Sequence, residues 1–186
     1  MNQTVAIILA ILLVISIIAF FVNFYNRLVM LKFNVEKAYG NIDVILKQRA
    51  DEIPNLVSVA KQFMNYEKNT LTKLTELRTF YNKTDDLEEK TQLANQMSKA
   101  LSSFFAVSEN YPILQSNTNF IELQKRVSEL ENKIADRREF FNDSVNLYNI
   151  GIHEFPNFLL SKILRYKNKS ILEISESEKR YDSVQF

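Results

Sequence analysis

The chain has 186 residues and a net charge of +1, so it lacks the basic excess that is typical of nucleic-acid-binding proteins. It contains no cysteine, which excludes disulfide bonds, thiolate catalysis and cysteine-type zinc sites. Only two glycines and three prolines are present, too few for the many turns of a sheet protein of this size, so we expect an almost entirely helical chain.

An apolar stretch comes first. Val5 to Val22 contains a single polar residue, Ser16, and no charged residue occurs before Arg27. About 20 such residues cross the hydrocarbon core of a bilayer as a helix. A buried helix of a soluble protein and a cleaved signal peptide are the alternatives, but a signal peptide should begin with a positive region and end at small residues. We predict a short N-terminus at residues 1–4 and a retained transmembrane anchor at residues 5–24.

The charges that flank this stretch predict its orientation. Arg27, Lys32 and Lys37 follow the anchor closely, with only Glu36 opposing them. By the positive-inside rule, the C-terminal side lies in the cytoplasm and the N-terminus lies outside. We therefore expect a single-pass protein of the inner or plasma membrane, in contact with the lipid bilayer and with the bulk of the chain in the cytoplasm.

A helical seam continues from the anchor. Apolar residues recur at alternating spacings of three and four residues, the period of one helix face. These residues are Leu28, Leu31, Val35, Ala38, Ile42 and Ile45. Arg49 occupies the next seam position. Pro54 then disfavours helical geometry at Ile53 and suits the first turn of a new helix, so we predict a turn at residues 50–53.

Three further helices follow from the same patterning. With the first, the predicted ranges are about 25–49, 54–81, 85–111 and 119–155. Asp85 with Glu88, and Asn119 with Glu122, have the spacing of capping boxes that begin the third and fourth helices.

These ranges predict an all-α fold. It consists of an N-terminal single transmembrane helix and, over residues 25–170, a long-helix antiparallel bundle of about four helices plus a short C-terminal amphipathic helix. A long coiled-coil arm is the main alternative, but the apolar faces are wider than a strict coiled-coil seam and favour the compact bundle. Residues 171–186 are rich in acidic side chains and are predicted to form a flexible acidic tail.

The stretch after Pro156 has the composition of a membrane-surface segment. If the helices alternate in direction, the chain returns to the bilayer near Phe155. No acid occurs from Phe155 to Ser170, and a helical wheel separates the apolar side chains from the basic ones. The candidate membrane-surface contacts are Lys162, Arg165, Lys167 and Lys169. The alternative is a last short helix that caps the bundle core.

Several polar residues lie near apolar seams, although Asn is a mediocre helix former. One explanation is an interhelical polar network that fixes helix register, and a polar groove for a peptide or partner helix is the alternative. The network candidates are Asn41, Asp43, Arg138, Asn142 and Asn149. The candidate partner contacts, at the predicted turn and pointing away from the membrane, are Lys47, Arg49, Asp51 and Asn55.

Motifs for catalysis or cofactor binding are nearly absent. His153 is the only histidine, which excludes a multi-histidine zinc site, and we interpret it as an ordinary residue near a helix end. Gly40 and Gly151 stand alone, without a phosphate-binding glycine-rich loop. We predict no catalytic residue, no metal and no cofactor.

Short blocks after the apolar stretch occur in a recognisable order. They are Asn41-Ile42-Asp43-Val44, Ile53-Pro54-Asn55-Leu56-Val57, Tyr111-Pro112 with Leu114, Asn119-Phe120 with Leu123-Gln124, and Tyr148-Asn149. In these blocks the chain resembles the LemA family of bacterial proteins. The resemblance implies a membrane helix followed by a helical bundle. It implies no catalytic residue, because the molecular function of the family is not established.

These observations favour a membrane-anchored, non-enzymatic helical bundle that acts as a scaffold or adaptor in the cell envelope. Its protein partners cannot be named from the sequence, and self-association into a homo-oligomer is one option. The alternative is a receptor-like module that binds a peptide, lipid or small ligand in an interhelical groove. An enzyme that uses carboxylates on bundle helices is the third class, and it would need a cleft that shifts their pKa values.

Overall fold

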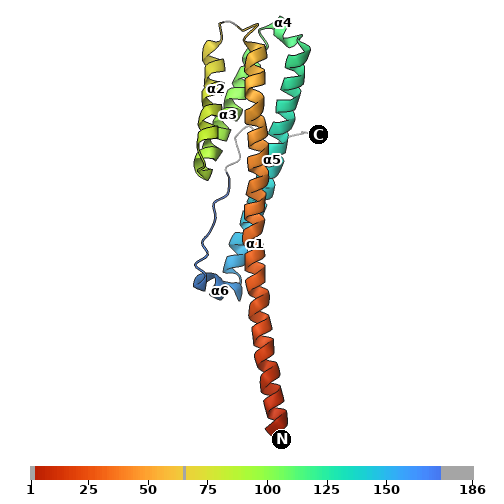
Figure 1. Cartoon of the computed structure of the whole chain (residues 1–186), viewed down its shortest axis with the longest axis vertical. Helices are drawn as coiled ribbons and strands as arrows, with labels where there is room; N and C mark the ends of the chain where they lie inside the picture. Colours follow the sequence, from red (N-terminus) through yellow and green to blue (C-terminus); the bar gives the residue numbers. More distant parts are fainter. Residues whose placement is uncertain (1–2, 65, 173–186) are drawn as a thin grey trace, which may run out of the picture. The chain divides into compact units, whose positions relative to one another are not determined.

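The computed structural model describes residues 3–64 and 66–172 of the chain (Figure 1). In this part the chain forms six α-helices and no strand. The helices are α1 (Gln3–Ala60), α2 (Lys68–Lys83), α3 (Leu87–Ser108), α4 (Pro112–Gln115), α5 (Thr118–His153) and α6 (Asn157–Ile163). The all-α prediction is confirmed. Most of the acidic tail predicted at residues 171–186 lies outside the described residues.

The chain divides into two compact units. As far as it is described, the first unit consists of residues 3–39 and 140–171, and the second of residues 40–139 and 172. Helices α1 and α5 contribute residues to both units, whereas α2, α3 and α4 belong to the second and α6 to the first. The membrane-proximal features predicted from the sequence therefore fall in the first unit, and most of the bundle falls in the second.

Helix α1 does not end at Pro54, so the turn predicted at residues 50–53 is wrong. The helix continues for 58 residues with Pro54 inside it. A proline in a helix interior cannot donate to the carbonyl oxygen four residues earlier, here that of Ala50. Arg78 of α2 supplies the missing donor, because its Nε donates to this oxygen at 3.1 Å. A long-range contact thus offsets the local cost of the proline.

The chain reverses further on, between the end of α1 at Ala60 and the start of α2 at Lys68. The second predicted helix, residues 54–81, is therefore wrong in its first half, because residues 54–60 belong to α1 and α2 begins only at Lys68. The reversal contains no glycine or proline. Its signal in the sequence is a gap in the apolar pattern, since seven positions separate Met64 from the next buried apolar residue, Leu71.

The capping residues of the next helices also differ from the prediction. Asp86, one residue after the predicted Asp85, caps α3 by accepting from the backbone N–H of Glu89 at 2.8 Å. Asn117, two residues before the predicted Asn119, accepts from the backbone N–H of Phe120 at 3.1 Å at the start of α5. The single turn of α4 was expected to be part of the connection. Several Asp and Asn residues in a row can each cap a helix, and tertiary packing selects one of them.

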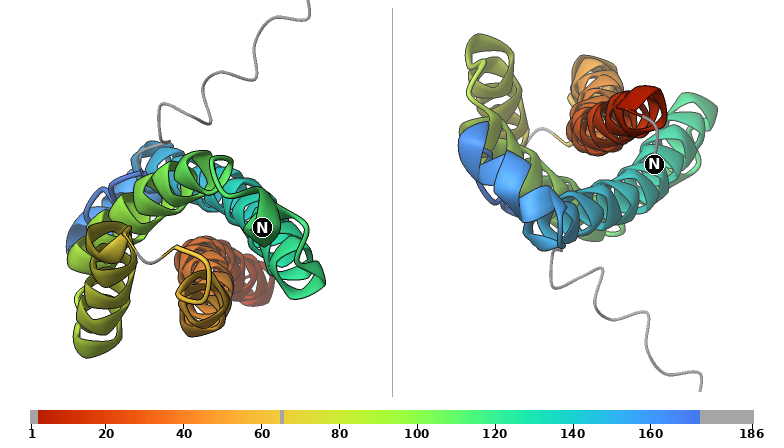
Figure 2. Two further views of the ribbon diagram at one scale, coloured as in Figure 1. Left: turned by 90° about the horizontal axis from the view of Figure 1, so that it is seen from above. Right: turned by 90° about the horizontal axis from the view of Figure 1, so that it is seen from below.

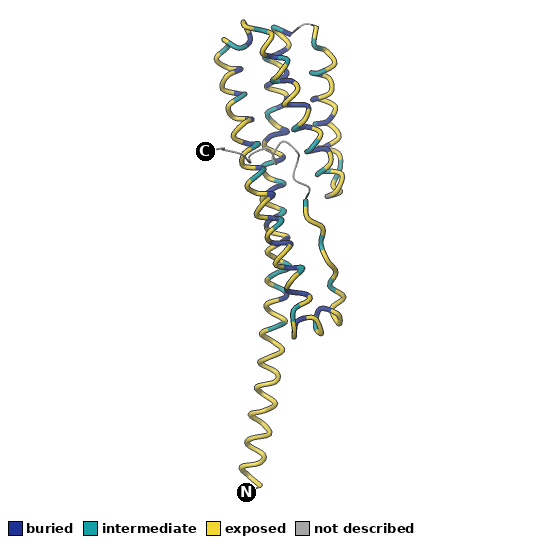
Figure 3. The backbone as a smooth tube through the Cα atoms, turned by 180° about the vertical axis from the view of Figure 1, so that it is seen from behind, coloured by how far each residue is buried: buried dark blue, intermediate teal, exposed yellow. Residues whose placement is uncertain are grey.

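Each unit buries its own apolar seam. In the first unit α1 contributes Leu28, Val35 and Ala38, and α5 contributes residues of the same kind. Those of α5 are Phe141, Val145, Tyr148 and Ile152. The aromatic pair Tyr39 and Phe141 joins the two helices, with ring centroids 6.2 Å apart. In the second unit the inward faces of α1, α2, α3 and α5 are buried, as Figure 3 shows along each helix.

The role of Arg78 can be tested by a double-mutant cycle on the full chain in detergent. Arg78→Met keeps the aliphatic stem but removes the donor to Ala50, and we expect it to lower the free energy of unfolding by about 1 kcal/mol. In a Pro54→Ala background the backbone N–H of residue 54 satisfies Ala50, so the same change should cost almost nothing. Arg137→Met, at an exposed position, is the control and should be additive with Pro54→Ala. Equal costs of Arg78→Met in both backgrounds would refute the compensation.

Candidate functional site

A buried arginine joins three helices of the second unit. Arg49 of α1 is 0% exposed, and its Nη1 donates to Glu131 Oε1 of α5 at 2.7 Å and to Ser98 Oγ of α3 at 2.6 Å. Its Nη2 donates to the carbonyl oxygen of Ala94 at 2.9 Å. Ser98 Oγ also lies 3.0 Å from Glu131 Oε2. The guanidinium therefore connects α1, α3 and α5 at a single level of the core.

This cluster can specify how the helices align. Removing a charge from water costs several kcal/mol, and the cost is offset only when counter-charge and hydrogen bonds meet in the right geometry. A shift of α1 by one turn would move Arg49 by about 5.4 Å and break every one of these contacts. Its Nε has no hydrogen-bond partner in the part of the chain that the structure describes, so the two terminal nitrogens provide the compensation.

Asp43 forms a second polar cluster in the same unit. Its Oδ1 accepts from Tyr81 Oη of α2 at 3.1 Å and from Lys90 Nζ of α3 at 3.2 Å. Lys90 Nζ also lies 5.8 Å from the centre of the Tyr81 ring. Asp43 thus links α1 to α2 and α3. The lysine of this cluster, Lys90, is largely sheltered from solvent.

The five residues of the predicted polar network are distributed over both units of the chain. Arg138 of α5 donates to Asn95 of α3 at 2.7 Å, whereas Asn41 is exposed on α1. In the division of the chain, Asn142 and Asn149 belong to the first unit, and Asn41, Asp43 and Arg138 belong to the second. Arg49, whose buried contacts join three helices, was predicted from the sequence to be a partner contact instead.

The predicted partner contacts lie on a continuous helix, not on a turn. Lys47, Asp51 and Asn55 are exposed, and their spacing of four residues puts them on one face of α1. Arg49 points into the core and cannot contact a partner at the surface, so its assignment as a surface contact is wrong. The reason is that Arg49 continues the apolar seam, and helical geometry carries it inward with the seam.

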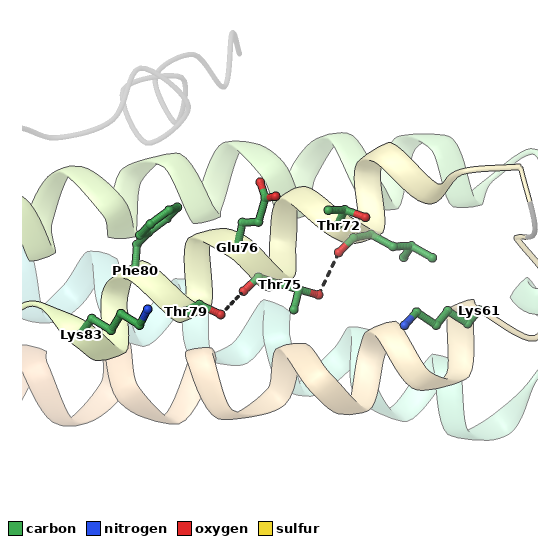
Figure 4. Close-up of a pocket in the computed structure, with 8 residues that line it drawn as sticks. Lys61, Thr72, Thr75, Glu76, Thr79, Phe80 and Lys83 are labelled. Carbon is green, nitrogen blue, oxygen red and sulfur yellow. Dashed lines mark hydrogen bonds between the residues drawn. The ribbon is translucent and has the colours of Figure 1, made fainter.

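An open hollow of about 370 Å³ lies beside α2 in the second unit (Figure 4). Lys61 and Lys83 stand at its two ends, with Thr72, Thr75 and Thr79 between them. The hydroxyls of Thr75 and Thr79 donate to carbonyl oxygens of α2 itself, at 3.0 and 2.8 Å. The asparagines expected to line an interhelical groove do not line this hollow.

In the first unit, the segment that follows α6 is held against α5. Asn149 donates to the carbonyl oxygen of Lys169 and accepts from its backbone N–H, both at 2.9 Å. His153 Nε2 lies 2.9 Å from Asn168 Oδ1, so the single histidine takes part in this attachment. The Tyr148 and Tyr166 rings lie 6.2 Å apart, and burial of Tyr148, followed by the charge of Tyr166, raises the pKa of the Tyr148 phenol.

The predicted membrane-surface residues lie in and just after α6. Lys162, Arg165 and Lys167 are exposed, and Lys169 is half-buried with its Nζ 5.8 Å from the centre of the Tyr148 ring. The helix ends at Ile163, so the helical wheel predicted for the stretch after Pro156 is wrong for the residues beyond Ile163. Arg165 adopts a positive φ of 54°.

The N-terminal part of α1 is exposed on all sides (Figure 3). It is long and apolar enough to cross a membrane by length and composition. Large apolar side chains such as Leu13 and Ile7 are more than half exposed, which is unusual for a chain surrounded by water. Among residues 3–64 and 66–172, no group of three or more His, Asp or Glu side chains is placed to hold a metal ion.

The described part of the chain is thus all-α and includes one helix that is long and apolar enough to cross a membrane. The sequence profile of the LemA family matches residues 38–186. The chain belongs to the LemA family. This agrees with the resemblance seen in the sequence blocks.

Individual proteins with similar sequences include another member named LemA. The magnetosome proteins MamQ 1 and MamQ 2 of Paramagnetospirillum magneticum are each 23% identical over 186 residues, covering 86% of this chain and 68% of the relative. The protein LemA of Metamycoplasma hominis is 24% identical over 155 residues, covering 83% of this chain and 71% of the relative.

The Arg49 cluster predicts a strong asymmetry between two neighbouring glutamates of α5. Glu131→Ala leaves the buried guanidinium without its counter-charge and should lower the free energy of unfolding by about 2 to 4 kcal/mol. Glu129→Ala removes an exposed carboxylate of the same helix and should change it by less than about 0.5 kcal/mol. Denaturant unfolding of the full chain measures both, and equal effects would mean that the buried pair does not stabilise the bundle.

Proposed function

We propose that the protein is a membrane-anchored scaffold or adaptor of the cell envelope, with no enzymatic activity of its own. The observation that supports this most is the single helix α1. Its first part is apolar and exposed, as a membrane anchor would be, and its later part buries one face in the bundle. A single element thus serves both as the anchor and as a wall of the bundle.

The proposed orientation puts the bundle in the cytoplasm. Arg27, Lys32 and Lys37 follow the apolar part of α1, and Lys32 pairs with Glu36 at 3.9 Å. Cytoplasmic flanks of membrane spans carry such an excess of basic residues. The boundaries that go with this proposal are an anchor at residues 5–24 and a bundle at residues 25–170.

The surface proposed for partner binding is the outer face of α1 in the second unit. It carries Lys47, Asp51 and Asn55, and next to them Val44, an apolar side chain that is 55% exposed. Opposite charges around an apolar centre are the arrangement by which one helix face docks against another protein. A second copy of the chain is one partner of this kind.

The hollow beside α2 supports a second candidate, a module that binds a small ligand or peptide. Lys61 and Lys83 at its ends would favour an anionic ligand. The hydroxyls of Thr75 and Thr79 already donate to the helix backbone, so they have less capacity to bind a ligand. We therefore give preference to the scaffold.

The orientation predicts how a protease would reach a tag fused after Phe186. The tag should resist added protease in intact cells and be digested only after the membrane is permeabilised, because the positive flank stays inside. A tag placed before Met1 on the same chain is the control, and protease should digest it before the membrane is permeabilised. Digestion of the C-terminal tag in intact cells would overturn the cytoplasmic placement.

The partner surface predicts a position-dependent crosslinking pattern in native membranes. A photo-crosslinking amino acid at position 47, 51 or 55 should give discrete adducts of one and the same mass. Lys73 and Lys133, which are exposed elsewhere in the second unit, are the control positions and should give none. An adduct of twice the chain mass would identify a second copy as the partner. Absence of adducts at all three positions, or equal adducts at the controls, would contradict the proposal.

A further inference from the structure

Helix α6 has the opposite polarity to that of a helix in a water-soluble protein. Its polar residues Asn157 and Ser161 are 1% and 6% exposed. Its apolar residues Phe158, Leu159 and Ile163 are 41%, 47% and 75% exposed. An amphipathic helix that packs on a core buries the apolar side and exposes the polar side, so α6 is not the core cap that the sequence left open as an alternative.

The hydrogen bonds of the two buried polar residues explain this orientation. Asn157 Nδ2 donates to the carbonyl oxygen of Gly151 at 3.0 Å, and Ser161 Oγ donates to that of Ile152 at 2.6 Å. These carbonyls belong to the last turn of α5, where no intrahelical donor remains. Because the polar side of α6 closes the end of α5, the apolar side faces away from α5. Figure 2 shows α6 beside the end of α5 in the view from below.

Contacts within the first unit place α6 at the end of the apolar part of α1. Glu154, three residues before α6, pairs with Arg27 at 3.1 Å, and Arg27 is the first charged residue after the apolar stretch. One turn earlier on α5, Gly151 lies so close to Leu31 that an added methyl group would collide with it. If the apolar part of α1 lies in a bilayer, α6 lies at the boundary between hydrocarbon and water.

Basic side chains border the exposed apolar residues. Lys162, Arg165 and Lys167 are all exposed, and residues 155–170 contain no acid. The surface thus combines apolar side chains with cations that would meet lipid phosphates. An interfacial helix of this kind buries its apolar face about 5–10 Å into the headgroup boundary.

The end of α6 keeps an arginine where glycine is usual. The backbone N–H of Tyr166 donates to the carbonyl oxygen of Ser161 at 2.9 Å, and that of Arg165 to Lys162 at 3.3 Å. This is a Schellman motif with Arg165 at its left-handed position, which favours glycine. An exposed cation thus occupies a position at which the backbone is strained for any residue other than glycine.

We propose that α6 and the residues after it form a membrane-interface surface that inserts Phe158, Leu159 and Ile163 into the bilayer and binds anionic phospholipid headgroups through Lys162, Arg165 and Lys167. The proposal rests on the proposed anchor, because the bilayer has to reach the end of the apolar part of α1. The surface would hold the first unit against the membrane through a second attachment, besides the anchor itself.

The full chain reconstituted in lipid vesicles provides the test. The sequence has no cysteine, so single cysteines can carry spin labels at Phe158, Ile163 and two reference positions. Leu13 in the apolar part of α1 reports the anchor, and Leu147, an exposed leucine of α5, is the matched control. Collision rates with oxygen, which dissolves in lipid, and with a water-soluble nickel chelate distinguish lipid from water and from protein.

We expect labels at positions 158 and 163 to collide more with oxygen and less with nickel than the label at 147. Nickel access equal to that at 147 would overturn the proposal. Low access to both reagents would also overturn it, because another protein surface would then cover α6. A lipid signal at Leu13 with a water signal at Ile163 means that the anchor holds and the interface helix fails, whereas water signals at both mean that the anchor itself fails.

A second comparison tests the headgroup contact. Adding phosphatidylglycerol to phosphatidylcholine vesicles should increase the protection of position 163 from nickel. The triple change Lys162→Gln, Arg165→Gly and Lys167→Gln should abolish that increase, and glycine suits the left-handed backbone at residue 165, so the fold is kept. Neutralising Lys73, Lys125 and Lys133 of the second unit is the matched control and should have no effect. Protection that is unchanged by the anionic lipid would overturn the headgroup assignment.

Discussion

The buried guanidinium of Arg49 is the constraint on which the second unit depends. It meets Glu131, Ser98 and the backbone of Ala94 at one level, so α1, α3 and α5 can take only one register. Apolar side chains alone tolerate small shifts, because one aliphatic contact is much like the next. A buried charge does not, since every displaced hydrogen bond leaves an uncompensated cation in the core.

The need to pair buried polar groups also accounts for two contacts between side chains and helix backbone. Arg78 donates to the carbonyl oxygen of Ala50 that Pro54 leaves free, and Asn157 with Ser161 closes the end of α5. In both cases a backbone acceptor without an intrahelical donor takes one from a side chain elsewhere. The first contact lets α1 continue, and the second turns α6 so that its apolar side faces outward.

Outward-facing apolar side chains are the feature of the first unit on which the proposed membrane contacts rest. The exposed part of α1 and the exposed side of α6 belong to this unit, and the ion pair of Arg27 with Glu154 joins the elements that carry them. The family match supports an all-α membrane-associated protein. In the proposed scaffold role, the apolar part of α1 anchors the bundle to the membrane. An anchor and an interface helix together would restrict how the first unit can tilt against a membrane, which a single span cannot do.

The apolar stretch, the helical seams and the place of Arg49 on a seam were determined by the sequence itself, because hydropathy and helical period act within one segment. The same patterning correctly predicted an all-α chain. The passage of α1 through Pro54, the choice of Asp86 and Asn117 as capping residues, and the partners of Arg49 were decided only by the tertiary structure. The orientation of α6 was also decided by the tertiary structure. Its polar residues are buried because they donate to carbonyl oxygens of α5, and a helical wheel of α6 alone does not show those acceptors. Each of these outcomes depends on a donor or acceptor distant in sequence or on a choice among equivalent neighbours, and local pattern carries no information about either.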